Sequence, residues 1–230
     1  MAVTAADKRR STEIVKRLRR AYPEAHCALD FKDPLQLLIA TILSAQCTDV
    51  RVNIVTPVLF KKYPTAAALA AAERTDVEQI IQSTGFFRSK AKSIQGCCTK
   101  LVAEHGGQVP QTMEELVKLP GVGRKTANVV LGTAYGVAAG VVVDTHVGRI
   151  SHRLGLTTKN DAVKIELDLM AQIPQRSWIA FSHEMIFHGR AICIARRPKC
   201  EICPLEPVCP RIGVEERGQR PKARKVASGK

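Results

Sequence analysis

The chain has 230 residues, of which 45% are hydrophobic, so it can fill the core of one large domain or two small ones. Its formal net charge of +14 favours a polyanionic partner, although some of that charge lies in the termini, which can be solvated arms. No run of 18 or more apolar residues occurs, and residues 1–20 carry seven basic residues and no hydrophobic signal core, so we expect an intracellular protein with no membrane partner.

Helical patterns follow one another through most of the chain. Pro34 begins an apolar segment that is typical of a buried helix. Thr75 and Thr112 each precede a glutamate by three residues, as in a capping box, and Gly85 and Gly106 are placed to end helices. The ranges expected to be helical are 7–22, 34–46, 50–62, 66–73, 89–105, 124–135, 145–154, 161–173 and 177–192.

Strand signals are almost missing from the sequence. The one strand-like run is GVVVD, residues 140–144, and it is too short to found a sheet. We therefore expect an all-α fold. Residues 214–230 are basic and contain little that could be buried, so this tail is predicted to be disordered.

The segment LPGVGRKTANVV, residues 119–130, places two glycines ahead of a lysine where a helix should begin. It is not a P-loop, which needs a glycine directly before the lysine and another five residues earlier, and it lacks the third glycine of a Rossmann fingerprint. A helix-hairpin-helix is one explanation. Gly121 and Gly123 can take positive φ, and the backbone N–H groups of the turn could then bind a phosphate without reading a base. An ordinary turn between two helices is the other.

The segment VVVDTHVGR, residues 141–149, places Asp144 between a β-prone run and an expected helix. Aspartate is a favoured N-cap, and this role alone would explain the residue. A catalytic carboxylate is the second possibility. The local sequence leaves both open.

Four of the eight cysteines fall within seventeen residues, at Cys193, Cys200, Cys203 and Cys209. In a reducing compartment such crowding favours a metal site over disulfides. Structural zinc is usually held by two close pairs of ligands, whereas here only Cys200 and Cys203 are closely paired. The spacing therefore favours a [4Fe–4S] cluster over zinc.

Three basic residues, Arg196, Arg197 and Lys199, lie between the first two of these cysteines. They could contact DNA phosphates or offset the negative charge of the thiolates. The nearby segment HEMIFH is not a zincin motif, because His183 and His188 are five residues apart and do not share a helix face. We expect these two histidines to be core or surface residues.

Taken together, LPGVGRKTANVV, VDTH and CIARRPKCEICPLEPVC closely resemble the endonuclease III family of helix-hairpin-helix DNA glycosylases, from about Pro34 to Cys209. The resemblance implies that Lys125 is the nucleophile, that Asp144 assists it, and that the four clustered cysteines bind a [4Fe–4S] cluster. It implies a bifunctional DNA glycosylase and AP lyase of base excision repair. Such an enzyme removes oxidised pyrimidines by attack on C1′ and cleaves the strand 3′ to the abasic site by β-elimination.

The resemblance also implies contacts to DNA. Gln46 in LSAQCTD matches the residue that fills the gap left by a flipped base. Phe86 in STGFFRSKA takes the wedge position on the opposite strand, where a familiar member has leucine, so the opposite-base preference stays open. The other residues expected to contact DNA are Leu119, Gly121, Gly123, Arg124, His146, Arg196, Arg197 and Lys199.

The implied fold has two all-α lobes. Residues 28–138 would form a six-helix domain that contains the hairpin, and residues 1–27 with 139–213 would form the lobe that holds the cluster. Damaged double-stranded DNA would lie in the cleft between them, with Lys125 and Asp144 on its facing walls. We expect a monomer that acts in the bacterial cytoplasm, in association with the nucleoid.

Three other functions compete with this one. The adenine glycosylase branch shares the hairpin, the aspartate and the cluster, but it usually lacks the lysine and carries an extra C-terminal domain. Lys125 and the early end of the chain argue against it. A module that only binds DNA would not need the pair Lys125 and Asp144, and a metal-dependent nuclease would need clustered carboxylates, which the sequence does not show.

Overall fold

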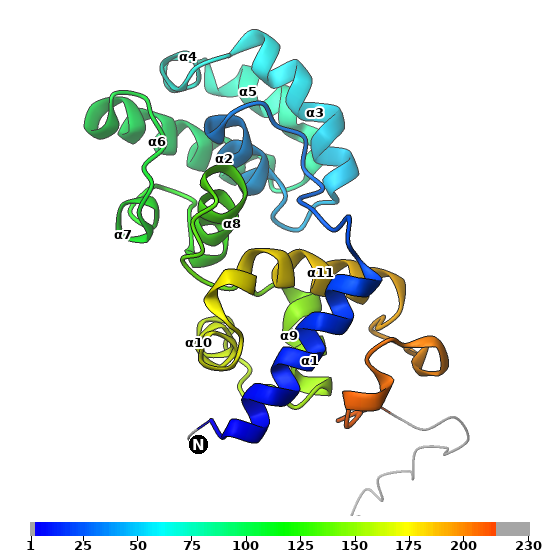
Figure 1. Ribbon diagram of the computed structural model, residues 1–230. Coiled ribbons are helices and arrows are strands. Elements are labelled where there is room, and N and C mark those ends of the chain that lie inside the picture. Colours follow the sequence, from blue (N-terminus) through cyan, green and yellow to red (C-terminus); the bar gives the residue numbers. More distant parts are fainter. Residues whose placement is uncertain (1–2, 215–230) are drawn as a thin grey trace, which may run out of the picture.

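The computed structural model describes residues 3–214, which form two helical lobes, one above the other in Figure 1. Within these residues no strand is found, so the all-α fold is confirmed. The longer helices are α1 (Ala5–Ala21), α2 (Pro34–Leu43), α3 (Asp49–Lys62), α5 (Arg74–Ile81), α6 (Phe87–His105), α8 (Arg124–Tyr135), α9 (Thr145–Arg153), α10 (Ala162–Gln172) and α11 (Trp178–Ala191). The short ones are α4 (Ala66–Ala70), α7 (Met113–Leu116) and the 3-10 helices η1 (Gln82–Thr84), η2 (Gln175–Ser177), η3 (Cys200–Ile202) and η4 (Glu206–Val208).

The upper lobe of Figure 1 has α2 in its core, with residues 37–40 and Leu43 fully buried. The Asp33 side chain caps this helix by accepting the Gln36 N–H, and Pro34 supplies the first turn with a residue that needs no partner there. Helices α3, α6 and α8 pack against α2. This lobe contains α2 to α8, and the six-helix domain expected for residues 28–138 stays a prediction.

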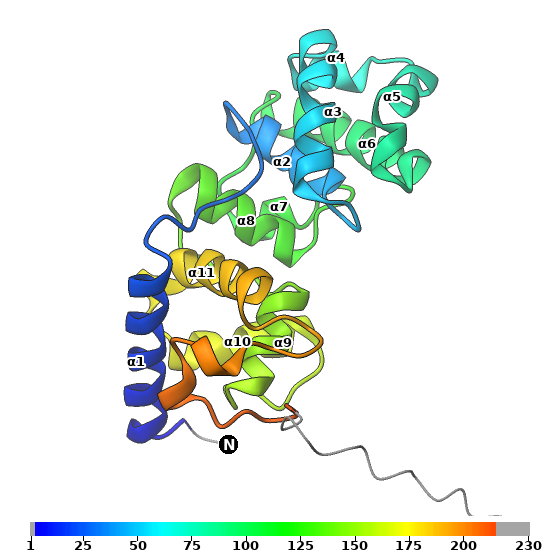
Figure 2. The same cartoon turned by 90° about the vertical axis from the view of Figure 1, so that its right-hand side faces the viewer.

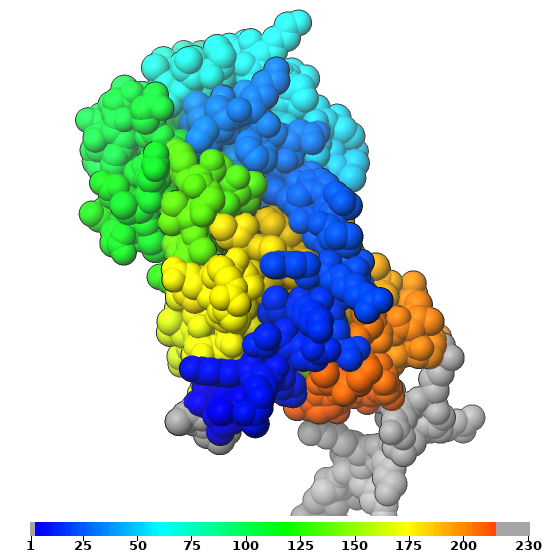
Figure 3. Space-filling model, viewed as in Figure 1, coloured from blue at the N-terminus to red at the C-terminus, as the bar shows by residue number. Residues whose placement is uncertain are grey.

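The lower lobe combines the N-terminal helix with the C-terminal half of the chain. Helix α1 packs beside α11, as both views in Figures 1 and 2 show, and it contributes Ile14 and Leu18 to a core that Phe181 and Met185 complete. In Figure 3 the blue N-terminal segment lies over the yellow and orange C-terminal segments. Burying the apolar stripe of α1 therefore joins the two ends of the chain.

Several local expectations are corrected by the structure. Thr75 is not an N-cap, because α5 already begins at Arg74 and Glu73 precedes it. Thr112 does cap α7, accepting the Glu115 N–H at 3.3 Å. The strand-like run 140–144, which is too short to form a sheet, forms no strand, and its residues 140–143 are buried in the connection between the lobes. The tail predicted to be disordered lies, from residue 215 on, outside the described residues, and the boundaries 28–138 and 139–213 stay predictions.

Candidate functional site

The hairpin between α7 and α8 is anchored by two apolar side chains. Leu119 and Val122 are 2% and 6% exposed, and the Val122 N–H donates to the Leu119 carbonyl at 3.1 Å. Leu119 was expected to contact DNA. Its side chain packs in the core of the upper lobe, so a contact with DNA, which stays a prediction, would be made by the backbone of Leu119.

The two hairpin glycines differ in their backbone conformation. Gly121 has φ +78°, and a Cβ there would lie 2.7 Å from the Cβ of Ser93, so the turn requires glycine. Gly123 has φ −98° and is the N-cap of α8, which corrects the expectation of a positive φ. The N-cap Gly123 has no side chain to accept a hydrogen bond from the first turn of α8, and an uncapped helix N-terminus of this kind favours an anion.

Lys125 and Asp144 come from different lobes and line the same two hollows. One is a groove of about 780 Å³ that also contains Gln46 and His146, and the other is a cavity of about 110 Å³ that also contains His183. Lys125 is exposed on the first turn of α8, whereas Asp144 stands at the start of α9. The structure therefore brings together the two residues that the sequence analysis singled out for catalysis.

Asp144 is also the N-cap of α9. Its Oδ1 accepts the Val147 N–H at 2.8 Å, so the structural explanation of this residue is correct. The cap does not compete with a catalytic role, because a carboxylate has a second oxygen and Asp144 stays partly exposed in the groove. The cap fixes where that carboxylate lies.

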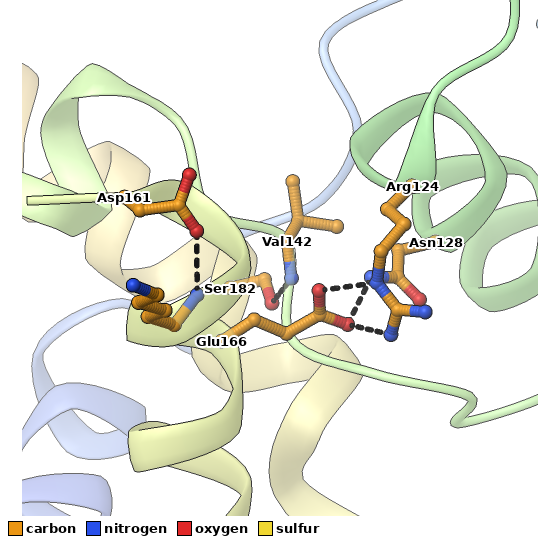
Figure 4. Close-up of polar contacts among 7 residues, drawn as sticks. Arg124, Asn128, Val142, Asp161, Glu166 and Ser182 are labelled. Carbon is orange, nitrogen blue, oxygen red and sulfur yellow. Dashed lines mark hydrogen bonds and ion pairs between the residues drawn. The ribbon is translucent and has the colours of Figure 1, made fainter.

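A buried carboxylate, which the sequence analysis missed, links α8 to the lower lobe. Glu166 of α10 is 3% exposed and accepts two hydrogen bonds from Arg124, Nε to Oε2 and Nη2 to Oε1, each at 3.0 Å (Figure 4). Asn128 Nδ2 donates to Oε1 at 2.7 Å. The hydrogen bond to Glu166 raises the pKa of Arg124. Arg124 thus contributes to the contact between the lobes, and its expected contact with DNA stays a prediction. The sequence signal that could have revealed Glu166 is a glutamate that lies among the apolar residues of α10, next to Ile165.

A second contact in Figure 4 holds the chain that leads to Asp144. The Val142 N–H donates to Ser182 Oγ at 3.0 Å, and this hydroxyl donates to the Trp178 carbonyl at 2.7 Å. Helices α10 and α11 thus hold both walls of the groove, one through Glu166 and the other through Ser182.

Gln46 and Phe86 occupy two exposed loops of the upper lobe. Both have left-handed backbones, with φ of 53° and 48°, which is uncommon for residues other than glycine. Phe86 is 66% exposed although it is aromatic. Gln46 lines the groove beside Lys125. Exposure and backbone strain at these two positions are compatible with the expected insertion into DNA, which stays a prediction.

The four clustered cysteines surround one pocket between α9, the end of α11 and the C-terminal loop, and all four are free thiols. Arg153 Nη1 lies 3.3 Å from Cys193 Sγ, and Lys199 lines the same pocket, so cationic groups face the thiols. In the described part of the chain, no three metal-binding side chains are grouped as for a single ion. Four soft sulfur donors around a shared pocket, with cations nearby, fit a [4Fe–4S] cluster.

Two arginines on α9 tie this helix to the cysteine loop. Arg149 donates to the Cys193 carbonyl at 2.9 Å and to the Gly189 carbonyl at 3.1 Å, and Arg153 donates to the carbonyls of Ile194 and Ala195 at 2.8 Å. Helix α9 therefore connects Asp144, which caps its beginning, to Cys193, the first of the four clustered cysteines.

The remaining predicted residues differ in their exposure. Arg196, Arg197 and Lys199 are exposed on the loop between Cys193 and Cys200, where their contact with phosphates stays a prediction. His188 is a core residue as expected, at 1% exposure, and its Nδ1 lies 2.9 Å from the Tyr22 hydroxyl. His146 is partly exposed, and its Nδ1 lies 3.2 Å from Arg149 Nη2.

The comparisons with known proteins agree with this geometry. Residues 39–175 match the model of the HhH-GPD superfamily of base excision DNA repair proteins. An endonuclease III of Synechocystis sp. is 60% identical over 206 residues, which is 90% of this chain and 94% of that protein. The chain belongs to the endonuclease III family. It is therefore a DNA glycosylase of base excision repair.

Two solved structures are similar over most of their length. A non-covalent endonuclease III–DNA complex matches with a TM-score of 0.84 and 46% identity, covering 89% of this chain and 95% of that one. A trapped covalent endonuclease III–DNA intermediate, an estranged-adenine complex, matches with a TM-score of 0.84 and 44% identity, covering 89% of this chain and 96% of that one.

Among the described residues of this endonuclease III family member, no helix is long and apolar enough to cross a membrane.

Proposed function

We propose that the protein is a bifunctional DNA glycosylase and AP lyase that removes oxidised pyrimidines, with Lys125 as nucleophile and Asp144 as its partner. The observation that carries the proposal is the position of these two residues, one from each lobe, on the walls of one groove. The trapped covalent intermediate of a similar endonuclease III is consistent with catalysis through an enzyme nucleophile.

The damaged nucleotide would reach Lys125 and Asp144 through the groove. A base inside the duplex must leave the stack before C1′ can be attacked, which costs a few kcal/mol and least for a poorly paired base. Gln46 and Phe86 would enter the space that the base leaves. The N–H groups at the start of α8, which no side chain caps, would bind a phosphate nearby and set the strand in register.

The chemical steps follow from an amine nucleophile and a carboxylate. The free amine of Lys125 attacks C1′, the glycosidic bond breaks, and the damaged base leaves with the bonding electron pair and takes up the proton that Asp144 has accepted from the amine. Asp144 stabilises the cationic sugar and accepts a proton from the attacking amine. Opening of the sugar ring yields a Schiff base between Lys125 and C1′. Removal of a proton from C2′ then expels the 3′ phosphate, which breaks the strand.

The four cysteines would hold a [4Fe–4S] cluster in this protein. When bound, the cluster supplies four metal–thiolate bonds that fix residues 193–209, and with them the basic loop Arg196 to Lys199. This loop and His146 would contact DNA phosphates beside the groove. We infer that the protein acts as a monomer on damaged double-stranded DNA, in the bacterial cytoplasm and in association with the nucleoid.

A panel of duplexes tests the substrate class. Each duplex carries one lesion, either an oxidised pyrimidine, an oxidised purine or an abasic site, opposite each of the four bases. We expect strand cleavage at oxidised pyrimidines and abasic sites. Comparing cleavage opposite each of the four bases would establish how Phe86 affects the opposite-base preference. Cleavage confined to oxidised purines would overturn the assignment of the substrate.

A further inference from the structure

We propose that Lys90 is a positioning residue that holds the Gln46 loop (residues 44–47) and the Phe86 loop (residues 85 and 86) in one fixed arrangement. The inference rests on the proposed function, since it treats these two loops as the part of the protein that replaces the flipped base. Lys90 itself would touch no DNA.

The geometry around Lys90 supports this role. The residue lies in α6 and is 5% exposed, and its Nζ donates to the Leu43 carbonyl and to the Thr84 carbonyl, both at 2.8 Å. Leu43 is the last residue of α2, and Thr84 is the last residue of η1. Carbonyls at the end of a helix lack partners within it and carry partial negative charge, so an ammonium is a favourable partner for both.

These two carbonyls lie just before the strained residues. Gln46 follows Leu43 by three residues, and Phe86 follows Thr84 by two. A left-handed backbone at such residues costs on the order of 1–3 kcal/mol and persists only where the surrounding structure imposes it. One ammonium therefore contacts the chain two or three residues before each strained position, and it joins two loops that lie forty residues apart in sequence.

The charge of Lys90 is costly where it lies. Burial disfavours the ammonium and lowers the pKa of Lys90, and among residues 3–214 no carboxylate forms an ion pair with it. In the described part of the chain, the hydrogen-bond partners of this cation are the two carbonyl oxygens. Its sequence signal was a lysine on the same face of α6 as Ala91 and Ile94, which are fully buried.

The test compares Lys90→Met and Lys90→Gln with Lys61→Met, a control that removes an exposed lysine of α3. Base excision is measured on a duplex with a stably paired oxidised pyrimidine and on one whose lesion lies in an unpaired bubble. We expect Lys90→Met to slow excision at the paired lesion about tenfold or more and to change the rate at the unpaired lesion less than about threefold. Lys90→Gln, which keeps a donor, should lose less.

The Gln46→Ala/Phe86→Ala background shows whether Lys90 acts through the loops. Adding Lys90→Met to that double variant should slow excision at the paired lesion no further, because the side chains that Lys90 positions are already gone. Equal losses on paired and unpaired lesions, or a full additional loss in the double variant, would overturn the proposal. If Lys90→Met does not fold, the same comparisons are made with Lys90→Gln. Failure of the wild-type protein to cleave an abasic site would refute the proposed function instead, before Lys90 is tested.

Discussion

Arg124 and Glu166 join the two lobes through a two-pronged hydrogen-bonded ion pair directly beside the proposed nucleophile. Glu166→Ala removes the carboxylate, so Arg124 and Asn128 lose their hydrogen-bond partner. Solvent partly screens the charge of Arg124, which limits the loss of stability. We expect a loss of about 2 kcal/mol of stability, seen as a lower Tm, together with slower cleavage of abasic DNA. Glu166→Gln should lose less, because its amide oxygen can still accept a hydrogen bond.

The exposed pair Lys100–Glu104 supplies the control for this comparison. Glu104→Ala removes a carboxylate that is 55% exposed, so the expected loss is below about 0.5 kcal/mol. If Glu166→Ala and Glu104→Ala lower the Tm equally, the lobe interface does not depend on Glu166.

The two hairpin glycines should respond differently to an added methyl group. Gly121→Ala places a Cβ against Ser93 at a positive φ, so the variant should be destabilised and should lose affinity for DNA. A Cβ at Gly123 meets nothing within 4 Å, and its φ suits any residue, so Gly123→Ala should keep its Tm. Thermal unfolding of both variants measures the difference. Equal Tm values for the two would show that the turn tolerates side chains at either position.

Gln46→Ala and Phe86→Ala should each slow excision far more at a stably paired lesion than at an unpaired one. Filling a vacated stack contributes little where no stack existed. The measurement is the ratio of single-turnover excision rates on the two substrates. If the ratio in both variants equals the wild-type value, the two side chains only pack against their neighbours and do not fill the vacated stack.

The cysteine pocket predicts a brown protein with broad absorption in the blue and with iron and inorganic sulfide in equal amounts. Cys203→Ser should lose iron and should impair folding and DNA binding more than the chemical step, because the cluster fixes a loop apart from Lys125. Cys47→Ser, outside the pocket, should keep its iron. A wild-type protein with one zinc and no iron would refute the cluster.

Much of the fold could be predicted because its signals are local. Asp33, Thr112 and Asp144 cap helices within three residues of themselves, and apolar spacing marks most helices. Thr75 misled because the pattern of a capping box occurs inside α5, where the chain was already helical. The burial of the Leu119 side chain was not predicted, because the position of a residue in a DNA-binding motif does not say which way its side chain points.

The contacts that organise the site could not be predicted from local sequence. Glu166 meets Arg124 over 42 residues, and Lys90 meets Leu43 over 47, so each depends on how the helices pack. Their only signal was a charged residue on an apolar helix face. A charged residue on such a face indicates that it has a buried partner, but it does not show which residue that partner is.

The most direct measurement of the central claim is borohydride trapping during turnover on abasic or lesion-bearing duplex DNA. A Schiff base is reducible, so the wild-type protein should become fixed to DNA as a species visible on a denaturing gel. Lys125→Gln should bind the lesion without trapping or cleavage. Asp144→Asn can keep the cap on Val147 and should fold, while excision falls about 10²-fold or more because the charge is lost. A Lys125→Gln protein that still traps and still cleaves would place the nucleophile elsewhere and contradict this mechanism.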